Sequence, residues 1–203
     1  MALSIDALTS LAQVKQYLGL SAATHDALLE GLIEAVSAQF NAFCGRKLMA
    51  RDYSHVSGDA AYDPDNALLS GSGYPELLLP QYPVINLSSL VVEGRSLAPS
   101  ENGSTGWLLD AGAGVLSLIG LVFPRGSHNL GVVYRAGFGA APADLAQAAV
   151  EQSAMRFQES AAGQGRLGIS ARTLADGSVS YHSGELLPQV RAVLERYRNR
   201  SLL

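Results

Sequence analysis

The sequence predicts an α+β fold in which helical segments at both ends of the chain enclose an antiparallel β subdomain. Apolar residues recur at helical spacing before Gly45, and short β-type runs separated by glycine and proline fill the next ninety residues. An alanine-rich segment with helical spacing then follows. The 203 residues are enough for one domain with a sizeable core. We expect a single domain built from segments 1–45, 46–138, 141–160 and 166–203.

Two helices are predicted before residue 46. In "TSLAQVKQYLGL", Thr9 is suited to cap a short helix and Gly19 to end it. The second helix is expected to begin near Thr24, to end at Gly45 and to measure about 30 Å at ~1.5 Å per residue. Its core-facing stripe consists of Leu28, Leu29, Leu32, Ile33, Val36, Phe40 and Phe43. Cys44, at the end of this stripe, is expected to be a small buried hydrophobic residue.

The β-type runs between residues 46 and 138 are short enough to form hairpins. They read "RDYSHVS", "ELLLP", "NLSSLVV", "WLLD", "GVLSLIG" and "LGVVYRA". Glu93-Gly94 and the stretch "DAGAG" lie where the chain must turn between two such runs. We therefore expect neighbouring runs to pair as antiparallel strands.

The stretch from Ala50 to Glu76 is the least periodic part of the chain. It contains four aspartates, Asp52, Asp59, Asp63 and Asp65. A calcium loop needs a fixed alternation of ligands and a glutamate at its twelfth position, and neither is present. An irregular solvated loop is the expectation.

The chain returns to helical spacing through "AGFGAAP". Two glycines permit a sharp turn, Pro142 suits the first turn of a helix, and the helix should run to about Ser160. Its stripe consists of Ala146, Ala149, Val150, Ser153, Ala154 and Phe157, and its small side chains would let the helix from Thr24 pack closely. A hairpin turning at Asp176-Gly177 and a last helix with Pro188 in its first turn complete the chain.

Charge and composition exclude several function classes. The net charge of −4 does not suit a general nucleic-acid binder, which neutralises phosphates with lysine and arginine. No apolar run approaches the roughly 20 residues of a membrane span, and no secretory signal precedes the first helix. We expect a soluble protein made in the cytoplasm. The last thirteen residues carry a net charge of +3, which leaves −7 on the preceding 190.

No catalytic, cofactor-binding or metal-binding residues are predicted. The chain lacks a G-x-S-x-G elbow, an H-E-x-x-H pair, a C-x-x-C pair and a Walker loop. The four histidines, His25, His55, His128 and His182, fall in different segments, and each is expected on the surface or in a hairpin. The sequence therefore does not favour an enzyme.

The order and spacing of these segments resemble the head-tail connector (adaptor) family of long-tailed bacteriophages. The resemblance rests on "LAQVKQYLG" at 11–19 and "FCGR" at 43–46. It continues through "YPVINLSSLVVEG", "VVYRAGFGAAPADLAQAAVEQSAMRF" and "GSVSYHSGELLPQVRAVLERYR", so it spans most of the chain. The loop at 53–74 fits the family least well.

The resemblance implies a fold that is mainly an antiparallel helical bundle with an inserted antiparallel β subdomain and a C-terminal hairpin plus helix. It implies a structural virion protein of the neck, at the head-tail interface, that forms a ring beneath the portal and provides a platform for neck and tail attachment. The implied partners are the portal protein, a stopper (head-completion) or tail-terminator protein, and further copies of the chain in a dodecameric ring. Genomic DNA would pass through the channel of this ring without sequence-specific binding, and no membrane is involved.

The C-terminal segment is the candidate surface for docking on the portal. Its apolar edge and its arginines could bind an acidic partner, and the same apolar edge could instead cover the protein's own core. The candidate docking residues are Arg191, Leu194, Tyr197, Arg198 and Arg200. Two alternatives to the connector ring stay open: a non-enzymatic binding module that is monomeric or a small oligomer, and another tail- or neck-completion protein.

Overall fold

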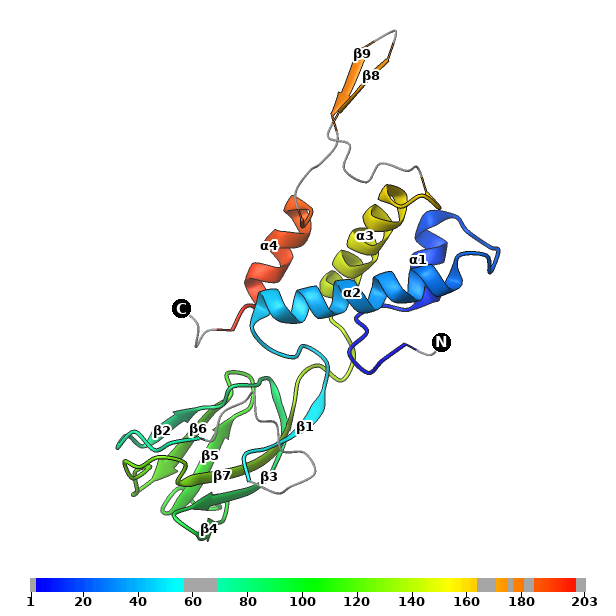
Figure 1. The fold of residues 1–203 in the computed structure, drawn as a ribbon. Helices are drawn as coiled ribbons and strands as arrows, with labels where there is room; N and C mark the ends of the chain where they lie inside the picture. Colours follow the sequence, from blue (N-terminus) through cyan, green and yellow to red (C-terminus); the bar gives the residue numbers. More distant parts are fainter. Residues whose placement is uncertain (1–2, 57–68, 164–170, 175–176, 181–184, 200–203) are drawn as a thin grey trace. The chain divides into compact units, whose positions relative to one another are not determined.

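The computed structural model describes residues 3–56, 69–163, 171–174, 177–180 and 185–199. The chain divides into two compact units, which Figure 1 shows as a group of helices and a group of strands. The helical unit comprises Met1–Gly45 and Ala141–Arg198. The β unit comprises Arg46–Ala140 and Asn199–Leu203. The β unit is thus inserted between two halves of the helical unit.

The helical unit contains the four helices α1 (Leu11–Leu18), α2 (Asp26–Cys44), α3 (Ala143–Glu159) and α4 (Pro188–Tyr197). Helix α2 lies across α1, α3 and α4, and α3 packs against both α1 and α4 (Figure 1). One buried cluster joins three of these helices through Val14, Leu29, Ile33, Val150 and Phe157. The packing of the helix at 143–159 on the long second helix is confirmed. None of the helices in the described part of the chain is long and apolar enough to cross a membrane.

The helix boundaries follow the predicted signals with small shifts. Ser10 caps α1 in place of Thr9, because its hydroxyl accepts from the Gln13 amide while the Gln13 side chain accepts in return from the Ser10 backbone. Helix α2 begins at Asp26, two residues after Thr24. Both helices end at a left-handed glycine, as predicted for Gly19 and Gly45.

The β unit is built from two antiparallel sheets. The first has the order β1-β7-β3-β4, with strands Arg51–Ser54, Leu130–Ala136, Val84–Val92 and Arg95–Leu97. The second has the order β2-β6-β5, with strands Glu76–Leu78, Val115–Ile119 and Gly106–Asp110. Buried residues of both sheets, among them Leu90, Val132, Leu116 and Leu118, form one core cluster. The two sheets therefore pack face to face as a sandwich.

The prediction that the chain is mainly a helical bundle is wrong. Within the described residues, the fold is a sheet-rich α+β arrangement of four helices and two antiparallel sheets with seven strands. The β segment buries an apolar core of its own between its two sheets and does not depend on a helical bundle for one. A separate two-stranded ribbon pairs β8 (Ala171–Leu174) with β9 (Gly177–Ser180). A turn was predicted at Asp176-Gly177, and Asp176 lies outside the described residues.

Two hairpin turns in the β unit are confirmed. Glu93 and Gly94 both adopt positive φ, 48° and 80°, and they connect the paired strands β3 and β4. This pair of angles is typical of the type I′ turn, whose twist matches that of the flanking strands. The turn between β5 and β6 closes through the Gly114 amide, which donates to the Asp110 carbonyl at 2.8 Å.

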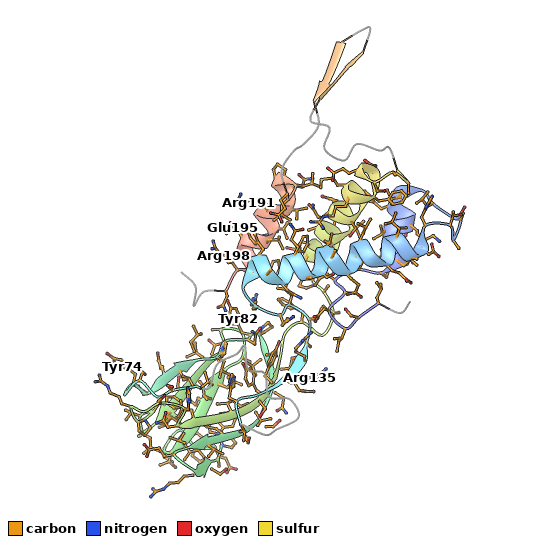
Figure 2. The ribbon with its side chains drawn as sticks, in the orientation of Figure 1. Tyr74, Tyr82, Arg135, Arg191, Glu195 and Arg198 are labelled. Carbon is orange, nitrogen blue, oxygen red and sulfur yellow. The ribbon has the colours of Figure 1, made fainter. Side chains whose placement is uncertain are left out.

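The outer faces of the two sheets both expose charged side chains. On the first sheet, the outward Arg135 of β7 forms a salt bridge with Asp52 of β1, N to O 3.0 Å (Figure 2). On the second sheet, the exposed outward residues of β2 and β5 are Glu76, Leu78, Leu108 and Asp110. Both outer faces are therefore typical of a solvated antiparallel sheet.

The two ends of the β insertion pair with each other. The Phe138 amide donates to the Leu48 carbonyl at 2.8 Å, and the Ala50 amide donates to the Phe138 carbonyl at 2.9 Å. Beside this pairing the guanidinium of Arg46 is buried, donates to the Tyr82 carbonyl and lies 4.1 Å from the centroid of the Tyr82 ring. The incoming and outgoing chains are thereby held side by side.

Within this pairing, Gly137 should not tolerate replacement by any other amino acid. Its φ is +108°, and a Cβ at this position would lie 2.6 Å from the Met49 carbonyl oxygen. Gly139, two residues on, has ordinary φ and nothing within 4 Å of an added Cβ. We expect Gly137→Ala to lower the free energy of unfolding of the β unit by about 2 kcal/mol or more, through backbone strain.

Urea unfolding followed by the fluorescence of Trp107, the single tryptophan of the chain, measures this effect, because Trp107 packs against the β core. Gly139→Ala is the matched control and should leave the midpoint unchanged or slightly raised. Equal midpoints for the two variants would contradict the assigned role of Gly137.

Candidate docking surface

The start of helix α4 is fixed by a buried glutamine of α3. Gln152 is fully buried; its Nε2 donates to the Glu185 carbonyl at 3.0 Å, and its Oε1 accepts from the Leu187 amide at 3.1 Å. Pro188 then occupies the first turn of α4, where its missing N–H costs nothing. The segment that enters α4 is therefore held against α3.

The inner side of α4 packs into the helical unit. Val190 and Leu194 are fully buried, and the Cys44 sulfur of α2 lies 3.7 Å from the Leu194 carbonyl oxygen. Cys44 is itself completely buried, which confirms its prediction as a small hydrophobic residue. This side of α4 covers the protein's own core.

The last turn of α4 is tied to the first turn of α3 through Asp144. The Tyr197 hydroxyl donates to Asp144 Oδ1 at 2.6 Å, and Arg196 forms a salt bridge to Asp144 Oδ2 at 3.0 Å. Asp144 also lies at the N-terminal end of α3, where the helix dipole favours a negative charge. The two helices are thus joined at this end by two charge-assisted contacts.

The outer side of α4 carries a charged surface that we call the arginine face, made of Arg191, Glu195 and Arg198. Figure 2 shows these three side chains along the side of α4 away from α3. Glu195 lies between the arginines, 3.9 Å from Arg191 and 3.7 Å from Arg198. All three side chains are more than 40% exposed, so the arginine face is accessible from solvent.

The structure separates the five predicted docking residues. Arg191 and Arg198 lie on the arginine face, whereas Leu194 is buried and Tyr197 is half-buried on Asp144. Arg200 lies outside the described residues. Sequence reasoning missed the contacts that Asp144 and Gln152 make with α4 and the residues before it, because contacts between residues 33 to 53 positions apart leave no local signal. Docking by these residues stays a prediction.

The histidines take different environments. His25 precedes α2 and its ring lies 5.4 Å from that of Phe157, while His128 is exposed. The prediction that each histidine is a surface or hairpin residue is wrong for His55, which is 3% exposed and stacks on Tyr134 at 5.7 Å. His182 lies outside the described residues. In the part of the chain that the structure describes, no three histidine, cysteine, aspartate or glutamate side chains are grouped to hold a metal ion.

Comparison with known families decides the classification. The family model described as head completion protein matches residues 7–200, nearly the whole chain. The chain belongs to the head completion protein family. The resemblance to phage head-tail connector and completion proteins is thereby confirmed. No curated protein matches the chain.

Three solved structures share the fold of this head completion protein. A chain from the neck of a native GTA particle, computed with C12 symmetry, has a TM-score of 0.56 and 19% identity, covering 98% of this chain and 92% of that one. A chain from the neck of an empty GTA particle, computed with C6 symmetry, has a TM-score of 0.55 and 21% identity, with coverages of 98% and 93%. A chain from the virion of a native gene transfer agent particle has a TM-score of 0.52, 21% identity and the same coverages. At these identities the likeness concerns the fold.

The Tyr197 hydroxyl should hold the end of α4 in place. Tyr197→Phe removes its hydrogen bond to Asp144 and leaves the ring, so we expect the amides of α4 to lose about 1 kcal/mol of protection against hydrogen exchange. Tyr17→Phe, at an exposed tyrosine of α1, is the control and should change nothing in α4. Unaltered exchange in Tyr197→Phe would show that the Tyr197 hydroxyl does not anchor the helix.

Proposed function

We propose that this chain is a structural, non-enzymatic subunit of the neck of a phage-like particle, where copies of it form a ring beneath the portal. In this role residues 1–203 act as one connector domain. The ring extends the DNA channel and offers a platform for the stopper or tail-terminator protein. DNA passes through it without sequence-specific binding.

Membership of the head completion protein family is the observation that carries this proposal. The likeness to chains in the necks of gene transfer agent particles, one of them computed with C12 symmetry, supports a place in a ring. The net charge of −4 supports a channel component that does not hold phosphates, because like charge repels DNA.

The arginine face is the part of α4 that we assign to the portal. With Val190 and Leu194 buried in the helical unit, an incoming partner meets Arg191 and Arg198 and not the apolar edge of the helix. Guanidinium groups bind carboxylates through paired hydrogen bonds, so the complementary portal surface is acidic. Glu195 lowers the net charge of the arginine face to +1. A partner must therefore displace Glu195 from the two arginines in order to bind them.

Reversing the charge of the two arginines of the arginine face should prevent attachment to the portal. We expect the double variant Arg191→Glu and Arg198→Glu to bind purified portal rings at least about tenfold more weakly than the wild-type chain, through like-charge repulsion. Co-sedimentation and negative-stain imaging measure the binding. Circular dichroism checks the fold, which the exposed positions of both residues should preserve.

The double variant Arg95→Glu and Arg125→Glu is the matched control. It makes the same change in net charge at two exposed arginines of the β unit and should bind like the wild-type chain. Equal binding by both double variants would reject the arginine face as the docking surface. A wild-type chain that neither binds portal rings nor forms rings would reject the proposed function itself.

A further inference from the structure

A groove runs between helices α1 and α3 of the helical unit. It encloses about 420 Å³ and is lined by Gln13, Gln16 and Tyr17 of α1 and by Ala143, Ala146, Gln147 and Val150 of α3. Tyr17, on its rim, is 55% exposed. None of the lining residues is an aspartate, glutamate, lysine, arginine or histidine. The groove therefore suits a neutral occupant that brings both apolar surface and hydrogen-bonding groups.

The same unit presents an uncharged helix surface, which we call the outer face of α2. It consists of the exposed residues Leu28, Gly31, Ala35, Ala38 and Ala42. Their alternating spacing of three and four places them in one line along the helix, about 21 Å long at ~1.5 Å per residue. A Cβ added at Gly31 would meet nothing within 4 Å, so this surface is open.

We infer that the groove between α1 and α3 receives the outer face of α2 from a second copy of this chain. Both surfaces are free of charge, in a chain that carries 32 acidic and basic residues, so neither would bury an unpaired charge on contact. The small side chains of the outer face let a helix axis come close to the α1–α3 pair. Of the groove glutamines, Gln13 already accepts from Ser10 and Gln147 already donates to Glu151, so the occupant is not held by these two side chains.

This contact is head-to-tail, because the groove and the outer face of α2 are different surfaces of one subunit. No lining residue of the groove belongs to α2. A contact of this kind repeats from copy to copy and closes into a ring when the rotation between copies allows it. The inference rests on the proposed ring function and names the surfaces that would build the ring.

Three single arginine substitutions in the full-length chain test the contact. Ala35→Arg charges the centre of the outer face of α2, Gln16→Arg charges the groove, and Ala192→Arg is the matched control on the exposed side of α4. All three positions are exposed, and arginine is a good helix former, so the fold should be retained. Each of the first two variants should weaken self-association by at least about 30-fold, because a charge would be buried without a partner.

Mixing the variants reveals whether the contact joins two different surfaces. The Ala35→Arg chain keeps an intact groove and the Gln16→Arg chain keeps an intact outer face, so together they should form a dimer that cannot extend. Sedimentation velocity and light scattering would show about twice the mass of 21.3 kDa in the mixture and monomers in each variant alone. Wild type and Ala192→Arg should form larger assemblies.

The other outcomes overturn the inference in distinct ways. If only Ala35→Arg is monomeric and mixing restores nothing, two α2 helices face each other. If both variants assemble like the wild-type chain, the ring uses other surfaces while the proposed function stands. A wild-type chain that binds portal rings but never associates by itself also overturns the inference, whereas failure to bind portal rings and to assemble would reject the proposed function.

Discussion

The pairing of the two ends of the β insertion is the constraint on which the rest of the chain depends. Helices α2 and α3 pack on each other, although residues 46–140 separate them. Such an insertion is compatible with that packing only when its first and last residues lie close together. The hydrogen bonds of Phe138 with Leu48 and Ala50 meet this requirement, and β1 pairs with β7 directly beyond them. The insertion can therefore fold around its own core without separating the helices that flank it.

Local signals in the sequence were enough to place the elements but not to arrange the strands. Each predicted β-type run contains a strand, and the glycines that end α1 and α2 could be identified because a left-handed residue is needed there. The sandwich depends on the pairing of β1 with β7 and of β2 with β6, which joins segments about forty to eighty residues apart. The periodicity of a short strand does not indicate which distant strand it pairs with. The expectation that helices dominate the fold came instead from the resemblance to the connector family, and the structure corrects it.

The docking residues illustrate the same limit at the level of side chains. The apolar spacing of the last helix is equally consistent with packing against the protein's own core and with docking on a partner. Only the structure shows that Leu194 is buried in the core. Tyr197 has an amphipathic side chain, and its hydroxyl is bonded to Asp144, a residue 53 positions earlier in the chain. His55 was expected on the surface or in a hairpin. In the structure its ring instead stacks on Tyr134 in the β unit.

The helical unit thus carries two kinds of surface with different physical properties. The groove and the outer face of α2 are uncharged, so a contact between copies through them would depend little on ionic strength. The arginine face is charged and solvent-exposed, so a contact through it would be screened by salt within about 8 Å at physiological ionic strength. On the proposed assembly, ring formation and attachment to the portal therefore respond to different conditions. A ring that has left the portal at high salt would keep its subunits together, because the force that holds neighbours is not the force that holds the ring in place.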